Sequence, residues 1–261
     1  MRYLRLFAVQ LRASALLLLQ YRVDFVINAV LSIFWTGTSI VPLVVLFQRR
    51  TTVAGWTWPE ALLVVGWFTV LKGVLEGAIQ PSLVNLVEQI RKGTLDFLLL
   101  KPADAQFLVS TSRFELRKIT DVLGGVAILA YALSRLDRIP APSAIAASFV
   151  LFLGATTILY SLFVLVACLA FVVVRVDNLS YLFASVYDAA RWPASFFRGA
   201  LAVLFTFVIP LAVMTTFPAL ALLGRIHAVP FVASLGGAIV FALGSRFAWT
   251  RAIRSYTSAG G

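Results

Sequence analysis

Two residues of opposite charge interrupt a long apolar stretch and are the strongest candidates for chemistry within a membrane. Lys72 and Glu76 lie four residues apart, so on a helix they share one face and can form an ion pair. An ionisable side chain in lipid usually faces a bundle interior or an aqueous cavity, because an isolated charge in hydrocarbon is costly. The pair therefore has two interpretations: residues that line a translocation path, or a structural ion pair near one leaflet.

The rest of the sequence offers little from which to build a catalytic site. It contains no phosphate-binding G-x-x-x-x-G-K-[ST] loop, no H-E-x-x-H zinc motif and no G-x-S-x-G elbow. His227 is the sole histidine and Cys168 the sole cysteine, which excludes a multi-histidine metal site and a disulfide within the chain. We expect that the chain is not an enzyme and binds no cofactor or metal, so an ATP-driven step would need a partner protein.

Composition places the chain in a membrane. Of its 261 residues, 61% are hydrophobic and 13% charged, and the mean hydropathy is +0.96. Soluble domains carry about 25% charged residues, so this chain has too little polar surface to cover itself in water. The net charge of +11 is spread between the apolar blocks rather than gathered on one patch. That distribution sets membrane topology and argues against a nucleic-acid partner.

Hydropathy predicts an all-α membrane protein with six transmembrane helices. Residues 1–22 read as an amphipathic helix in the membrane interface, because apolar residues recur there at three- and four-residue steps with arginines on the other side. Residues 23–261 then form a single transmembrane domain. Five of its crossings are predicted at about 23–47, 60–86, 119–134, 143–174 and 229–249.

The fifth crossing in chain order has two alternatives. In the first it spans 177–190, and residues 192–225 dip into the outer leaflet and return as a pair of short helices. In the second, residues 178–198 lie on the cytoplasmic face and 199–220 cross the membrane. Proline content in 192–225 favours the first, and the count of Lys and Arg favours the second. Both alternatives leave the two termini in the cytoplasm.

The polar stretch Glu88–Lys118 is the most informative segment. It holds six Lys or Arg residues, and Gly93 can end one helix before Asp96 begins a short new one that Pro102 breaks. Phe97–Leu100 is an apolar ridge within this charged loop. Exposed apolar residues framed by charges are typical of a docking surface; the other interpretation is an interfacial helix that rests on lipid headgroups.

The string G-T-L-D-F-L-L-L-K-P at Gly93–Pro102, after I-R-K at Ile90–Lys92, resembles the loop between the second and third helices of the type-2 (ABC-2-like) permeases of bacterial ABC transporters. A weaker match follows in R-W-P-A-S-F-F at Arg191–Phe197 and F-P-A-L-A-L-L-G-R at Phe217–Arg225. With the six-helix hydropathy, the resemblance covers nearly the whole chain.

The resemblance implies a six-helix permease with an amphipathic connecting helix, a cytoplasmic coupling helix and a re-entrant helix pair between helices 5 and 6. The expected partners are two ABC ATPase subunits, which bind ATP and Mg, and a second permease subunit, identical or related. The coupling region would comprise Gly93, Asp96, Phe97, Leu98, Leu99, Leu100, Lys101 and Pro102.

These observations predict the permease subunit of an ATP-driven exporter in the bacterial cytoplasmic (inner) membrane, coupled to its ATPases through the 88–118 loop. The alternative is a secondary transporter driven by an ion gradient. Such transporters commonly contain inverted repeats around a midplane site, and the two halves of this sequence show no convincing repeat.

Overall fold

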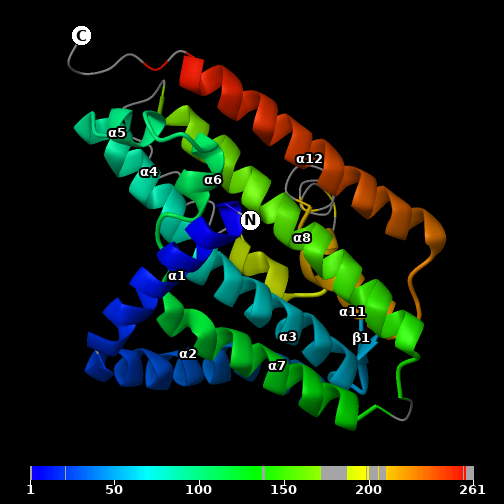
Figure 1. Ribbon diagram of the computed structural model, residues 1–261. Coiled ribbons are helices and arrows are strands. Elements are labelled where there is room, and N and C mark those ends of the chain that lie inside the picture. The colour runs from blue at the N-terminus through cyan, green and yellow to red at the C-terminus, as the bar shows by residue number, and fades with distance from the viewer. Residues whose placement is uncertain are drawn as a thin grey trace.

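A computed structural model describes residues 2–20, 22–136, 139–171, 187–197, 199, 205, 210–254 and 256 of this chain. These residues form a bundle of helices with one short hairpin (Figure 1). The elements are α1 (Arg2–Gln20), α2 (Arg22–Gln48), β1 (Thr52–Val53), β2 (Trp56–Thr57), α3 (Trp58–Val74), η1 (Leu75–Ile79), α4 (Gln80–Lys92), α5 (Asp96–Leu99), α6 (Ala105–Ser110), η2 (Leu116–Lys118), α7 (Ile119–Ser134), α8 (Pro142–Leu169), η3 (Asp188–Arg191), η4 (Ala194–Phe196), η6 (Ala212–Thr216), α11 (Phe217–Leu222) and α12 (Ala228–Arg254).

Four helices among the described residues are long and apolar enough to cross a membrane. They are α2, the continuous helix Trp58–Lys92, α8 and α12. The third predicted crossing is present as α7, an apolar helix of 16 residues. Most of both alternatives for the fifth crossing lies outside the described residues, as does the predicted end of the fourth crossing beyond Phe171. The chain is therefore an all-helical membrane protein with several candidate spans.

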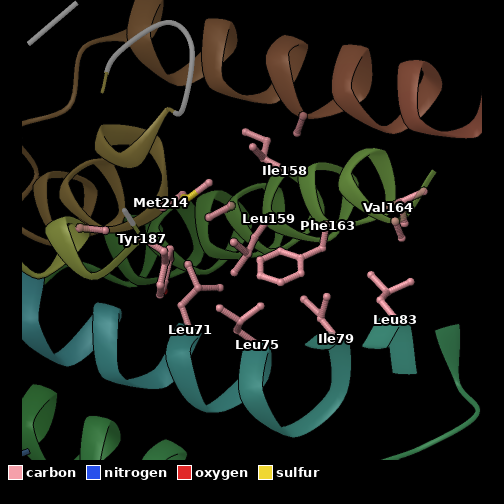
Figure 2. Packing of buried hydrophobic residues seen from close by; sticks show 14 of the residues in the cluster. Leu71, Leu75, Ile79, Leu83, Ile158, Leu159, Phe163, Val164, Tyr187 and Met214 are labelled. Atoms are coloured by element: carbon pink, nitrogen blue, oxygen red, sulfur yellow. The ribbon is translucent and has the colours of Figure 1, made fainter. Parts of the chain in front are cut away.

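The helix Trp58–Lys92 is the central element of the bundle. Two thirds of its apolar window is buried (67%), against 6% for α2 and 17% for α12. One side of it packs on α8, where Leu71, Leu75 and Ile79 meet Leu159 and Phe163 (Figure 2). Its opposite side packs on α7, and α12 lies along α8 (Figure 1).

Glycines allow the close approach of α3 and α7. A Cβ atom on Gly125 would lie 2.6 Å from the backbone nitrogen of Val70 and 2.9 Å from the carbonyl oxygen of Gly66. A Cβ atom on Gly73 would lie 2.9 Å from the backbone nitrogen of Val122. Small residues at such positions let backbones touch in a membrane, where packing rather than the hydrophobic effect holds helices together.

A π-helical turn, η1, interrupts the central helix just before Pro81. Proline has no N–H and its ring collides with the carbonyl four residues earlier, here that of Gly77. The Gly77 carbonyl oxygen instead accepts a hydrogen bond from the Glu115 N–H at 2.8 Å. The irregular turn is thereby attached to the far end of the 88–118 loop, and Lys72 and Glu76 lie beside and within it.

A β-hairpin formed by β1 and β2, with a two-residue turn, joins α2 to α3. Ala54 and Gly55 both have positive φ, 48° and 84°, as a type I′ turn requires. The side chain of Glu60 then accepts a hydrogen bond from the Thr57 N–H at 2.9 Å, and Pro59 occupies the first helical turn. These features fix the start of the central helix.

Candidate functional site

The end of α4 is built to turn the chain sharply into α5. Gly93 has a φ of 67°, and the N–H groups of Gly93 and Thr94 bond to the carbonyls of Ile90 and Gln89 at 3.2 and 3.0 Å. This is the Schellman arrangement, in which a glycine with positive φ ends a helix. Helix α5 then begins at Asp96. Gly93 and Asp96 thus occupy the positions that the sequence predicts.

The apolar ridge on α5 divides into two faces. Phe97 and Leu100 are exposed, at 74% and 81%, whereas Leu98 is 9% exposed and packs into the core. Leu99 is partly buried against the same core, and Lys101 and Pro102 are exposed beyond the helix. The sequence predicts a single apolar ridge at Phe97–Leu100. In the structure, helical geometry turns only the first and last of these four residues outward.

An arginine from the last helix holds the segment after α5. Arg246 of α12 donates two hydrogen bonds to the Asp104 carboxylate, at 3.2 and 2.6 Å, and a third to the Gln106 amide oxygen at 2.7 Å. The Arg246 hydrogen bonds hold the pKa of Asp104 below its ordinary value. Asp104 also caps α6 by accepting the Phe107 N–H at 3.0 Å. Sequence reasoning missed this contact; the signal that could have found it is Arg246 itself, the one charged residue within the predicted crossing 229–249.

Two further elements bind the same segment. The Tyr160 hydroxyl of α8 lies 2.7 Å from the Ser110 hydroxyl and accepts a hydrogen bond from the Gln106 amide at 3.1 Å. From α1, the Tyr3 ring packs edge-on against Phe107 at a centroid distance of 5.0 Å. Helix α6 therefore connects α5 to α1, α8 and α12.

The second candidate site, Lys72 and Glu76, belongs to a larger ionic cluster. Their ion pair is long, 3.7 Å, while Glu76 lies 2.5 Å from the Lys118 ammonium. Lys118 also lies 3.6 Å from Asp121, whose carboxylate accepts a hydrogen bond from Ser32 of α2. Sequence reasoning missed Lys118 and Asp121, which are distant from Glu76 in sequence. Lys118 of η2 pairs with Glu76, and Asp121 of α7 joins the cluster through Lys118.

Lys72 and Asp121 line a cavity of about 630 Å³ bounded by α2, α3 and residues 188–197. Glu76 faces a smaller adjoining pocket of about 90 Å³. Within the described ranges, no group of three or more His, Cys, Asp and Glu residues could hold a metal ion.

The fold defines a helical integral membrane protein with a charged cluster between its helices and a loop at one end that bears exposed apolar residues. Comparison with protein families gives its class: the profile of the ABC-2 family transporter proteins matches residues 33–260, so the chain belongs to that family. No curated protein and no solved structure matched the chain.

Proposed function

We propose that this chain is the permease subunit of an ATP-driven exporter, and that separate ATPase subunits act on it through the loop 88–118. ATP and Mg would be bound by two ATPase partners, and a second permease, identical or related, would complete the translocation path. The chain itself would carry out no chemistry and bind no cofactor. Its setting would be the bacterial cytoplasmic membrane, where it also contacts lipid.

The observation that carries this proposal is the exposed apolar pair Phe97 and Leu100 at the end of the bundle. Each is more than 70% exposed. Their neighbours in the loop are charged, so contact with lipid is not needed to explain this exposure. The segment is also held by α1, α8 and α12, so a force applied at α5 would reach three other helices. A partner can move a conformational equilibrium only by binding its states differently, and this segment gives such a partner a mechanical connection.

The start of α1 and the end of α12 lie near α6 and α5, which supports a position of both on the cytoplasmic side. Tyr3 contacts α6, and the tail residue Tyr256 is close enough for the Asp96 charge, added to burial, to raise its pKa. Figure 1 shows the C-terminal end of α12 at the same end of the bundle as α5. Residues 1–22 hold four arginines and residues 88–118 hold six lysines or arginines, as expected for cytoplasmic segments.

The described parts of the segment 192–225 support the proposed re-entrant external pair. Its described parts are the short helices η4, η6 and α11. The Ala194 N–H donates to the Thr216 hydroxyl at 3.1 Å, which joins the two arms. Trp56, in the hairpin at the end of the bundle opposite α5, donates to the Ser195 hydroxyl at 3.1 Å.

The test is copurification with an ATPase after coexpression. Phe97→Asp and Leu100→Asp should each reduce the recovered ATPase at least about tenfold, because a charge in the apolar centre of an interface is costly. The matched control is Ile139→Asp, which alters an even more exposed apolar residue (96%) in the loop before α8. Undiminished ATPase recovery with both α5 variants would remove this loop from the mechanism.

The alternative is a secondary transporter, which the charged cluster beside the π-helical turn favours, because such transporters bind ions at interrupted helices. Transport that follows an imposed ion gradient and needs no ATPase would establish it.

A further inference from the structure

The cavity beside Lys72 has the size of a ligand site. Its volume of about 630 Å³ lies within the range of roughly 300–1,000 Å³ that is usual for small-molecule sites. The adjoining pocket shares Ser32, Trp35, Lys72 and Asp121 with it, so these four residues stand where the two spaces meet. Lys72 is 14 residues after Trp58, about 21 Å along the helix, which places the site within the membrane.

Asp121 brings an incompletely bonded carboxylate to this cavity. The residue is 7% exposed, and Ser32 donates to its Oδ1. Its Oδ2 has no hydrogen-bond partner among the described residues, and the Lys118 ammonium lies 3.6 Å from it, beyond hydrogen-bonding distance. A buried acceptor without a donor is costly, so a ligand that donates a hydrogen bond to this carboxylate would be stabilised once a small rotation of the Asp121 side chain turned Oδ2, which is shielded in this structure, toward the cavity.

Lys72 brings the opposite charge. Glu76 makes its short contact with Lys118 at 2.5 Å and stays 3.7 Å from Lys72, which leaves the Lys72 ammonium with donors for a ligand. Arg191 and Asp188, the other charged residues of the described wall, already satisfy each other through an ion pair of 3.1 Å. Two incompletely satisfied groups of opposite sign therefore face one cavity.

The described remainder of the wall combines aromatic rings with serine and threonine hydroxyl groups. Trp35, Phe68 and Trp192 line the cavity, and Phe68 is fixed by stacking on Tyr187 at a centroid distance of 5.3 Å. Aromatic rings bind an apolar body and also favour a nearby cation. The charges of the described lining residues sum to zero, so neither a purely cationic nor a purely anionic ligand is matched by them.

We propose that this cavity binds an amphiphile whose polar end carries both a primary amine and an anionic group. The amine donates to Asp121, the anionic group pairs with Lys72, and the apolar chain lies along Trp35 and Trp192. This inference rests on the proposed function, because it names the substrate class that the permease would export.

The test uses the purified full chain in nanodiscs of phosphatidylglycerol, a lipid without an amine. The probe is palmitoyl lysophosphatidylethanolamine, compared at equilibrium with hexadecylamine and hexadecyl phosphate, which have the same chain length and one charge each. The wild type should bind the zwitterion about tenfold more tightly than either single-charge probe, the effect of one charged hydrogen bond.

Variants assign each charge to its residue. Asp121→Asn should bind the zwitterion only as well as hexadecyl phosphate, and Lys72→Met only as well as hexadecylamine, while Lys72→Arg retains the preference. Lys92→Met, which alters an exposed lysine outside the cavity (side chain 60% exposed), is the control and should behave as the wild type. If Asp121→Asn does not fold, Lys72→Met decides alone.

Equal affinity of the wild type for all three probes, or a preference that survives Lys72→Met, would overturn the inference. Equal affinity is also the result expected if another subunit fills the cavity. The measurement needs no ATPase. If no ATPase copurifies with the wild type, the proposed function is rejected while the binding result stands. If the binding preference is absent, this inference is rejected while the copurification result stands.

Discussion

At the scale of single residues, the contact between Asp104 and Arg246 is the most informative one. It joins a loop residue to the last helix across 142 positions of sequence. Both side chains are partly exposed, at 35% and 48%, so we expect the pair to stabilise the fold by only about 0.2–1 kcal/mol. Its importance would lie in transmitting motion between α6 and α12.

Arg246→Asp should therefore lower transport per ATP hydrolysed severalfold, while changing the melting temperature little. The physical reason is repulsion between the new carboxylate and Asp104, which would detach α12 from the loop. Combining Arg246→Asp with Asp104→Arg restores the attraction and should recover most of the coupling. Transport and ATP hydrolysis measured together in proteoliposomes check this, and a double variant no better than the single one would contradict it.

The same pair predicts a dependence on pH. Because the pKa of Asp104 is lowered in the folded protein, its contribution to stability is present above the ordinary value of 3.8 and is lost as the pH falls through the lowered value. The wild type should thus be slightly more stable than Asp104→Asn at neutral pH, and the difference should vanish in acid.

At the scale of elements, the contact between α3 and α7 depends on the absence of side chains at Gly66, Gly73 and Gly125. Gly125 is buried and its Cα faces the backbone of α3, whereas the neighbouring Gly124 has open space around the position of a Cβ atom. The two residues thus form a matched pair for testing this contact, since they share a helix and differ in what they face.

Gly125→Ala should destabilise the protein by about 1–3 kcal/mol, the usual effect of overpacking. Gly124→Ala should be neutral or slightly stabilising, because alanine favours helix and meets nothing there. Thermal unfolding of the two variants in the same detergent gives the comparison. Equal melting temperatures would show that the helices can separate at no cost.

At the scale of the whole molecule, α5 and the loop before α8 lie at opposite ends of the bundle (Figure 1). With Cys168 replaced by serine to remove the only native thiol, Ile139→Cys should react with a membrane-impermeant maleimide in intact cells. Phe97→Cys should react only after permeabilisation, since the proposed orientation puts α5 in the cytoplasm. Labelling of both in intact cells, or the reverse pattern, would contradict the proposed orientation.

The sequence by itself determined the membrane setting and the long helices. A bilayer requires about 20 apolar residues per crossing and internal bonding of every backbone group, so hydropathy located α2, α8 and α12 to within a few residues. Local rules sufficed where the cause is local: Gly93 ends α4 because it can adopt a positive φ. The second predicted crossing, 60–86, proved longer in the structure, which continues it from Trp58 to Lys92.

Only the tertiary structure decided which side chains meet. The ridge Phe97–Leu100 reads as uniform in sequence, yet packing against the core buries Leu98 and leaves Phe97 and Leu100 outside. Asp121 reads as a residue at a helix start, and becomes part of a cavity wall only because glycines bring α7 against α3. Contacts between distant segments depend on how helices pack, a property of the assembled bundle that no local stretch of sequence contains.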